Sequence, residues 1–354
     1  MFYHGFELLG ARLNGESEFD GVRDWVFTLN PFVAFIQEGH SGVAMFIVLS
    51  GFILSLGTLG RRIEYFKFIW ARTLRIYPLL IVCLAAAVLV RPWGSVSLYT
   101  IFISLIPLSV AGNLQSIFTV MFWAVTIEFQ CYLLFPLVMW LSNRAGTRAI
   151  VALIIFTIVL RFGVYWLQGG GSQRDLSYAS IFGRFDQFLI GMLIARLHVT
   201  GSFSWLRPRH LLMSCALVLV SLTAYNQAGG APADGYWKLL WPTYEAAMWA
   251  ALIITYLHAP LKPKSALSTV VARIGEISYS TYLWHSAIIL AALDFAFYLP
   301  ITGLPHLDAF ISTALMIWPV TLMVGLLSYH LIEWPFLRIR PKYVLPALPL
   351  EQKP

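Results

Sequence analysis

The chain has 354 residues, of which 59% are hydrophobic and only 12% are charged. A soluble domain carries about twice that share of charged residues, and the mean hydropathy of +0.74 points the same way. The composition therefore excludes a soluble enzyme and predicts an all-α, polytopic helical transmembrane bundle in a lipid bilayer. The net charge of +7 does not indicate a nucleic-acid partner, because the basic residues follow a membrane topology.

The first 42 residues are acidic, with six Asp or Glu and two Arg. The apolar residues between Phe2 and Leu9 resemble the outer end of a helix. We therefore expect 1–42 to form a truncated first helix and an outer loop. About 15 more apolar residues upstream in the natural chain would complete the ~20 that a span needs.

Nine apolar runs follow, and each is a predicted span: 43–60, 76–91, 118–141, 149–167, 181–198, 211–227, 243–258, 275–293 and 309–336. A further run, Leu98–Val110, is only 13 residues long and ends in a polar patch. This pattern is typical of a re-entrant hairpin, which enters the membrane and leaves on the same side.

The distribution of Lys and Arg supports this topology. If the hairpin does not cross, the inside segments hold 17 of the 24 basic residues; they are 61–75, 142–150, 196–210, 259–274 and 338–354. Cytoplasmic loops carry such an excess. The sequence thus predicts one integral membrane domain, 1–354, with spans over 43–337 and a cytoplasmic C-terminal tail, 338–354. We expect a multi-pass protein of the inner (plasma) membrane.

An acidic residue, Glu128, lies inside the apolar stretch from Trp123 to Pro136. A carboxylate at membrane depth costs several kcal/mol unless it faces a partner or a wet cavity. Glu128 is therefore a candidate functional residue. The alternative is a carboxylate that only bonds a neighbouring helix.

Six segments occur in a distinctive order: GHSGVAMFIVLSGF (39–52), RTLRIYP (72–78), WAVTIEFQCY (123–132), GRFDQF (183–188), ISYSTYLWH (277–285) and IEWPF (332–336). Together they resemble the motifs of acyltransferase family 3, membrane enzymes that O-acylate sugars and other extracytoplasmic acceptors. Ala124 and Cys131 depart from the family pattern, which has Ser or Thr and Phe there. Only the end of the family's R-x10-H motif is present, at His4.

The resemblance implies the main site residues. His4 would be the general base that deprotonates an acceptor hydroxyl, and Glu128 would orient its ring and stabilise the imidazolium. Arg72 and Arg75 would bind the phosphates of acyl-CoA, because guanidiniums suit phosphates. The alternative for this pair is positive-inside anchoring.

Supporting or substrate-binding roles would fall to Ser50, Trp123, Arg184, Tyr282, His285 and His40. His40 would line the acceptor entrance or lie on the surface. His285 would contact substrate or bond a backbone carbonyl. No His, Cys, Asp or Glu spacing indicates a metal, so acyl-CoA is expected as a co-substrate and no cofactor is predicted.

The expected function is transfer of a short acyl group, most often acetyl, from cytoplasmic acyl-CoA to a hydroxyl of an extracytoplasmic glycan or glycolipid. Such O-acetylation would modify a polysaccharide. The alternative is a multi-span transporter or lipid-carrier flippase, in which Glu128, Asp186, Arg184 and His285 form a relay. Transporters usually show internal repeats, and none is evident in this sequence.

Overall fold

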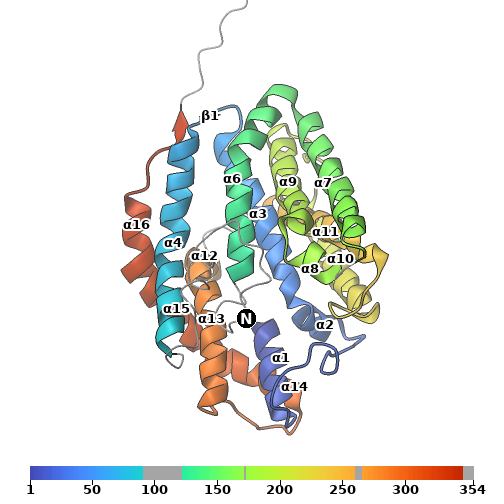
Figure 1. Cartoon of the computed structure of the whole chain (residues 1–354), viewed down its shortest axis with the longest axis vertical. Coiled ribbons are helices and arrows are strands. Elements are labelled where there is room, and N and C mark those ends of the chain that lie inside the picture. Colours follow the sequence, from blue (N-terminus) through green and yellow to red (C-terminus); the bar gives the residue numbers. More distant parts are fainter. Residues whose placement is uncertain (91–121, 171–172, 260–264, 346–354) are drawn as a thin grey trace, which may run out of the picture.

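The computed structural model describes residues 1–90, 122–170, 173–259 and 265–345, and most of them lie in helices (Figure 1). The longer helices are α1 (Phe2–Leu13), α3 (Gly42–Thr58), α4 (Tyr65–Val90), α6 (Phe122–Ala145), α7 (Thr147–Leu167), α9 (Ile181–Val199), α10 (Pro208–Gln227), α11 (Trp241–Leu257), α12 (Ala266–Glu276), α13 (Ser278–Asp294) and α15 (Trp318–Ser328). The shorter ones are α2 (Pro31–Gln37), α8 (Gln173–Tyr178), α14 (Pro305–Ser312) and α16 (Trp334–Arg338). The predicted all-α class is confirmed.

Six helices are long and apolar enough to cross a membrane: Gly39–Thr58, Tyr65–Ala86, Phe122–Ala145, Thr147–Leu167, Pro208–Gln227 and Pro305–Arg338. The other three predicted spans correspond to α9, α11 and α13, which are also helical. Helix α9 carries three charged residues, and α11 and α13 have 17 residues each. The exact number of spans therefore stays a prediction. The predicted hairpin at Leu98–Val110 lies outside the described residues.

Helices α3 and α6 lie between two groups of helices (Figure 1). On one side, α4 packs against α6, α13 and α16. On the other, α9 packs against α3, α7 and α11, and α10 packs against α11. Helix α1 lies against α13 and α14 at one end of the molecule. This arrangement brings segments from the whole chain around the middle of the bundle.

A close helix contact joins α3 and α9 through two glycines. A Cβ atom at Gly51 would lie 2.1 Å from the carbonyl oxygen of Phe188, and one at Gly191 would lie 2.0 Å from that of Val48. Only a residue without a side chain fits at either position. Small residues let membrane helices approach to this distance, where dispersion contacts hold them together. The two glycines thus fix how α9 lies against α3.

The last apolar run forms one long helix with two wide turns. The π-helical segments Thr313–Ile317 and Tyr329–Glu333 each come directly before a Trp-Pro pair, at Pro319 and Pro335. A proline has no N–H to donate and its ring clashes with the carbonyl four residues earlier. A π turn shifts the hydrogen bonding by one residue and relieves both problems. The chain can therefore continue as a helix through both prolines.

A two-stranded sheet ties the end of the described chain to the start of α4. Strand β1 (Arg62–Ile63) pairs antiparallel with β2 (Val344–Leu345). Next to them, Tyr343 accepts a hydrogen bond from Glu64 through its backbone oxygen. Its hydroxyl accepts one from Nη2 of Arg72 at 2.9 Å.

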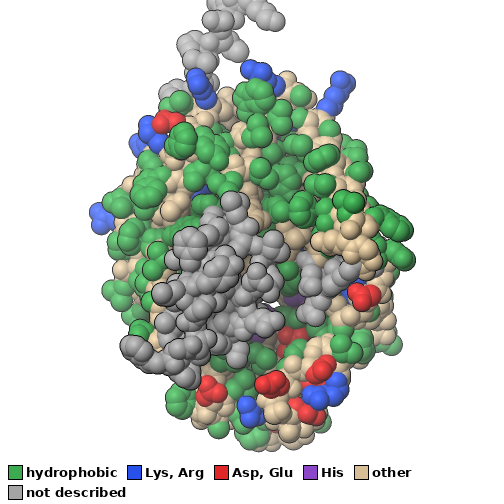
Figure 2. Space-filling view, in the orientation of Figure 1, with side chains coloured by type: hydrophobic (Ala, Val, Ile, Leu, Met, Phe, Trp, Pro, Cys, Tyr) green, Lys and Arg blue, Asp and Glu red, His purple; other side chains and the backbone are tan. Residues whose placement is uncertain are grey.

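Charged side chains gather at the two ends of the molecule (Figure 2). Lys and Arg side chains lie at the end that holds β1 and the turn between α6 and α7. Most of the visible Asp and Glu side chains lie at the opposite end, near α1. Between the ends, the side chains of the described residues on this face are largely hydrophobic, as expected for a belt in contact with lipid.

Candidate active site

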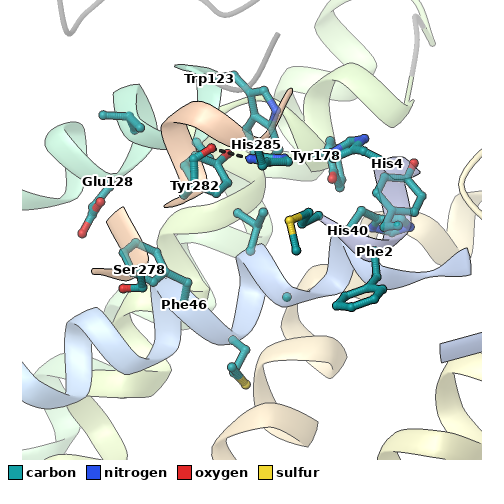
Figure 3. Close-up of a pocket in the computed structure, with 18 of the residues that line it drawn as sticks. Phe2, His4, His40, Phe46, Trp123, Glu128, Tyr178, Ser278, Tyr282 and His285 are labelled. Atoms are coloured by element: carbon teal, nitrogen blue, oxygen red, sulfur yellow. Dashed lines mark hydrogen bonds between the residues drawn. The ribbon is translucent and has the colours of Figure 1, made fainter. Parts of the chain in front are cut away.

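A cavity of about 800 Å³ lies where the two groups of helices meet α1 (Figure 3). It brings together seven of the ten predicted site residues: His4, His40, Trp123, Glu128, Arg184, Tyr282 and His285. They come from α1, the Gly39–Ser41 turn, α6, α9 and α13. The other three, Ser50, Arg72 and Arg75, lie outside the described cavity lining, on α3 and α4.

Glu128 is buried at one end of the cavity and is held from both sides. Its Oε1 accepts a hydrogen bond from Oγ of Ser50 at 3.1 Å and another from the Tyr132 hydroxyl. The sequence pattern thus located a carboxylate that faces a cavity and is also bonded by a neighbouring helix.

His4 lies at the other end of the cavity (Figure 3). Its ring centroid is 5.4 Å from that of His285 and 4.5 Å from that of Tyr3. The carboxylate nearest to it is Glu7, with Oε2 at 3.7 Å from Nδ1. Glu128 forms neither a hydrogen bond nor an ion pair with His4. The structure therefore places both predicted catalytic residues in one cavity without direct contact between them.

His285 makes a contact with a backbone carbonyl, which was one of the two alternatives that the sequence offered for it. Its Nδ1 lies 2.5 Å from the carbonyl oxygen of Tyr282, which holds the ring in place. The ring also lines the cavity, and Tyr282 lines it one turn earlier on α13. The backbone bond is therefore present, and contact of His285 with substrate stays a prediction.

His40 has a carboxylate partner that the sequence reading missed. Its Nε2 lies 2.9 Å from Oε2 of Glu38, and both side chains are buried. The other oxygen of Glu38 accepts a hydrogen bond from Nδ2 of Asn226, on α10, at 2.9 Å. The spacing Glu-x-His at the start of a motif was the only local signal for this pair. Asn226 lies 188 residues away and gave none.

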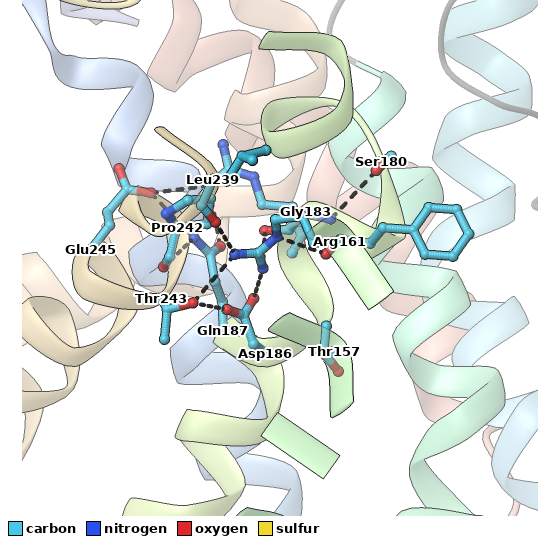
Figure 4. A network of polar contacts seen from close by, with 12 residues as sticks. Thr157, Arg161, Ser180, Gly183, Asp186, Gln187, Leu239, Pro242, Thr243 and Glu245 are labelled. Atoms are coloured by element: carbon cyan, nitrogen blue, oxygen red, sulfur yellow. Dashed lines mark hydrogen bonds and ion pairs between the residues drawn. The ribbon is translucent and has the colours of Figure 1, made fainter. Parts of the chain in front are cut away.

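Two buried ion pairs hold α9 against its neighbours (Figure 4). Arg161 of α7 donates from Nη2 to Asp186 at 2.7 Å, and Asp186 also accepts from the hydroxyl of Thr243. Arg184 donates from Nη1 to Glu245 of α11 at 3.1 Å and lies over the ring of Tyr178. Arg184 and Glu245 both line the cavity, so this network forms part of its wall.

Arg72 is enclosed by aromatic rings. Its guanidinium lies within 6 Å of the centroids of Phe68, Tyr132 and Tyr343, at 5.3, 5.6 and 5.4 Å. It also bonds the Tyr343 hydroxyl, so it fastens the C-terminal strand to α4. Arg75 is half-buried one turn further along α4. Arg72 and Arg75 therefore lie one turn apart on α4, as predicted. Arg72 also holds the C-terminal strand through Tyr343.

The family model for an acyltransferase domain, Acyl_transf_3, matches residues 17–329. The chain belongs to acyltransferase family 3. The match begins in the loop after α1, runs from α2 to the beginning of the last wide turn, and includes every predicted site residue except His4. The chain is therefore a multi-pass membrane acyltransferase, and the predicted family is confirmed.

Two curated relatives have compatible names. The chain is 26% identical over 264 residues to "Putative acetyltransferase ORF330" of Acidianus two-tailed virus, covering 74% of this chain and 76% of that one. It is 23% identical over 347 residues to "Putative membrane-bound transacylase BcsY" of Komagataeibacter xylinus, covering 90% and 82%. No solved structure matches the chain. Within the acyltransferase family, the cavity is thus the candidate active site.

Proposed function

We propose that this acyltransferase moves a short acyl group, acetyl in the first instance, from cytoplasmic acyl-CoA to a hydroxyl of an extracytoplasmic glycan or glycolipid. The observation that carries the proposal is the cavity, because it holds imidazoles, a carboxylate and aromatic walls inside a membrane bundle. The names of the two relatives, an acetyltransferase and a transacylase, support acyl transfer and an acetyl donor.

The chemistry requires three things of the protein. A base must take the proton of the attacking hydroxyl, donors must stabilise the oxyanion that forms on the carbonyl, and the acyl donor must be held in place. A neutral imidazole suits the first task, since its pKa is ordinarily near ambient pH. The family resemblance assigns this role to His4, with Glu128 as the second catalytic residue, and we propose both.

The acyl donor would approach from the basic end of the molecule. Arg72 and Arg75 lie on the half of α4 nearer that end, and Tyr132 links Arg72 to Glu128 at the end of the cavity. Phosphates of acyl-CoA held by these guanidiniums would leave the extended pantetheine pointing into the bundle. We propose that the pantetheine passes Glu128 and brings the thioester to the His4 end of the cavity, where the acceptor hydroxyl also lies. Trp123, Arg184, Tyr282 and His285 would line the path of the donor between the two ends.

The test is thiol release from acetyl-CoA by the purified full chain in the presence of envelope glycans. An acyltransferase releases free CoA in step with ester formation on the glycan. A transporter or flippase releases none, and that result would overturn the proposal. Recovery of the acetyl group on nitrogen instead of oxygen would keep the acyltransferase class and change the acceptor.

A further inference from the structure

The carboxylate of Glu7 lies beside the ring of His4, one turn further along α1. Residues three apart share a helix face, and Oε2 of Glu7 is 3.7 Å from Nδ1 of His4. The Glu7 side chain is only 5% exposed and lies outside the described cavity lining. The His4 side chain is 23% exposed and lines the cavity. The ring therefore faces the space that a substrate would fill, and the carboxylate approaches it from within the protein.

Within the described parts of the chain, His4 forms an ion pair with no carboxylate other than Glu7. Its ring neighbours are Tyr3 and His285, with centroids at 4.5 and 5.4 Å, and neither is an acid. Glu128 lies at the other end of the cavity, where its hydrogen bonds come from hydroxyl groups. A carboxylate in direct contact with a protonated His4 must therefore come from α1 itself.

Two glycines of α1 limit how far this pair can move. A Cβ atom at Gly5 would lie 2.1 Å from Oγ1 of Thr313, and one at Gly10 would lie 2.6 Å from Nδ1 of His306. Helix α1 therefore packs closely against α14 and the π-helical segment that follows it. Small residues allow such close packing of membrane helices. The part of α1 that carries the imidazole and its carboxylate is thus held at both of its ends.

The distance between the two side chains suits a charge that appears only during the reaction. At 3.7 Å, Oε2 and Nδ1 are too far apart for a good hydrogen bond to a neutral ring. A protonated ring places a positive charge next to the carboxylate, and opposite charges attract strongly where water is excluded. Catalytic hydrogen bonds often shorten once the reactants are bound. Glu7 would therefore stabilise the imidazolium more than the neutral ring, which is what lowers the barrier of a reaction.

We propose that Glu7 is the positioning residue of the general base His4. This inference rests on the proposed acyltransferase function and adds a group that holds the imidazole. A carboxylate only accepts hydrogen bonds, so Glu7 favours the ring that has its proton on Nδ1 and its lone pair on Nε2. The acceptor hydroxyl attacks the thioester carbon while its proton passes to Nε2. The C–S bond then breaks and the thiolate takes that proton, which gives an ester and a free thiol. Glu7 stays ionised throughout.

A double-mutant cycle tests whether Glu7 acts through His4. Thiol release from acetyl-CoA by the purified full chain is measured with octyl glucoside as the acceptor. Glu7→Gln should lower kcat about tenfold or more and leave KM for acetyl-CoA unchanged, because the base and not the donor is affected. In the His4→Gln background, Glu7→Gln should change the remaining rate less than about twofold, because residues that act as a unit are not additive. Equal losses in both backgrounds would show a merely structural role and overturn the inference.

Two further variants test whether the charge of Glu7 is what matters. Glu7→Asp keeps a carboxylate on a shorter side chain, so its kcat should lie between those of the wild type and Glu7→Gln. The matched control is Glu16→Gln, because Glu16 lies in the loop after α1 and pairs with the exposed Arg23 at 3.2 Å. Its kcat should equal that of the wild type. Wild-type kcat in Glu7→Gln, or a Glu7→Asp variant no better than Glu7→Gln, would overturn the inference.

The position of the proton on His4 tests the inference without any need for acyl transfer. Solid-state NMR of the full chain in lipid bilayers, with isotope label in the histidine nitrogens only, separates the two neutral forms of the ring. The signals of His4 are those that disappear in His4→Gln. We expect the proton on Nδ1 in the wild type, and a measurable share of it on Nε2 in Glu7→Leu, whose side chain accepts no hydrogen bond.

The two measurements separate this inference from the proposed function. The expected proton positions without thiol release in the wild type would refute the proposed function alone. Thiol release by a wild type that carries the proton on Nε2 of His4, or no change of the proton position in Glu7→Leu, would refute the role of Glu7 alone.

Discussion

Glu128 illustrates how one side chain can be both bonded and accessible. Ser50 and Tyr132 hold its carboxylate at the end of the cavity. Burying a carboxylate at this depth costs free energy, and the hydrogen bonds from the two hydroxyl groups offset part of that cost. The sequence predicted the importance of Glu128 from its position in an apolar run. It could not predict that His4 and Glu128 lie at opposite ends of the cavity.

Replacing Glu128 tests whether its charge is used. We expect Glu128→Gln to lower thiol release from acetyl-CoA by at least 100-fold while the protein still folds, because the amide can keep a hydrogen bond to Ser50. Ser50→Ala should cost less, about tenfold, since Tyr132 still holds the carboxylate. Initial rates at saturating acetyl-CoA measure both. Wild-type activity in Glu128→Gln would reduce this residue to a packing role.

The ion pair between Arg161 and Asp186 concerns stability. Both side chains are fully buried and 2.7 Å apart. Asp186→Asn would leave the Arg161 charge buried without a counter-charge, so we expect a loss of about 3–5 kcal/mol in the free energy of unfolding. The measurement is thermal unfolding in detergent. The matched control is Glu276→Gln, which breaks an exposed pair with Arg273 and should change stability by less than about 1 kcal/mol. Equal effects of the two variants would contradict this reading.

The residues that the sequence missed share a physical cause. Glu38 bonds Asn226 across 188 residues, Arg161 pairs with Asp186 across 25, and Glu245 pairs with Arg184 across 61. Motif spacing reports only what is close along the chain. Side chains paired across helices become visible only after the helices have packed.

At the level of helices, the contact between α3 and α9 should be the most sensitive to added volume. Gly51→Ala would place a methyl group 2.1 Å from a backbone oxygen, where no side-chain rotation helps. We expect a cost of about 1–3 kcal/mol or more, from overpacking. Gly57→Ala, also in α3, meets nothing within 4 Å and is the matched control. Thermal unfolding and expression level measure both; equal tolerance would show that α9 can shift.

Helix α4 links the proposed donor site to the C-terminal strand. Arg72→Ala should raise KM for acetyl-CoA about tenfold or more, and Arg72→Lys should restore only part of the loss, because an ammonium lacks the forked donors. Tyr343→Phe removes the hydrogen bond that Arg72 makes to the strand and keeps the guanidinium. Its KM should stay near the wild-type value. A rise in KM in Tyr343→Phe equal to that in Arg72→Ala would assign Arg72 to anchoring the tail.

At the scale of the whole molecule, the charged ends predict the orientation. The basic end carries the turn between α6 and α7, and the acidic end carries the loop after α1. In a background with the exposed Cys215 replaced by serine, Arg148→Cys should react with an impermeant maleimide only after the cells are opened. Glu18→Cys should react in intact cells. Reaction of Arg148→Cys in intact cells would reverse the membrane orientation.

The helical class and the places of the helices could be predicted because hydrophobic run length and Lys/Arg placement are properties of the chain alone. The cavity could not, since it depends on how α1, α6, α9 and α13 pack. The turn at Pro319 shows the same limit. A proline in an apolar run signals a disturbed helix, but the π turn that absorbs it appears only in three dimensions.

The cavity also has a consequence for the fate of the acyl donor. Space that admits a sugar hydroxyl at His4 admits water as well, and water is the more abundant nucleophile. Without an acceptor, the enzyme should therefore act as a slow thioesterase. The ratio of acyl transfer to hydrolysis then measures how completely a bound acceptor displaces water from the walls formed by Tyr178 and Trp241. A good acceptor must offer a hydroxyl and must also fill this space. Candidate acceptors could therefore be identified by how strongly they suppress the hydrolysis of acetyl-CoA.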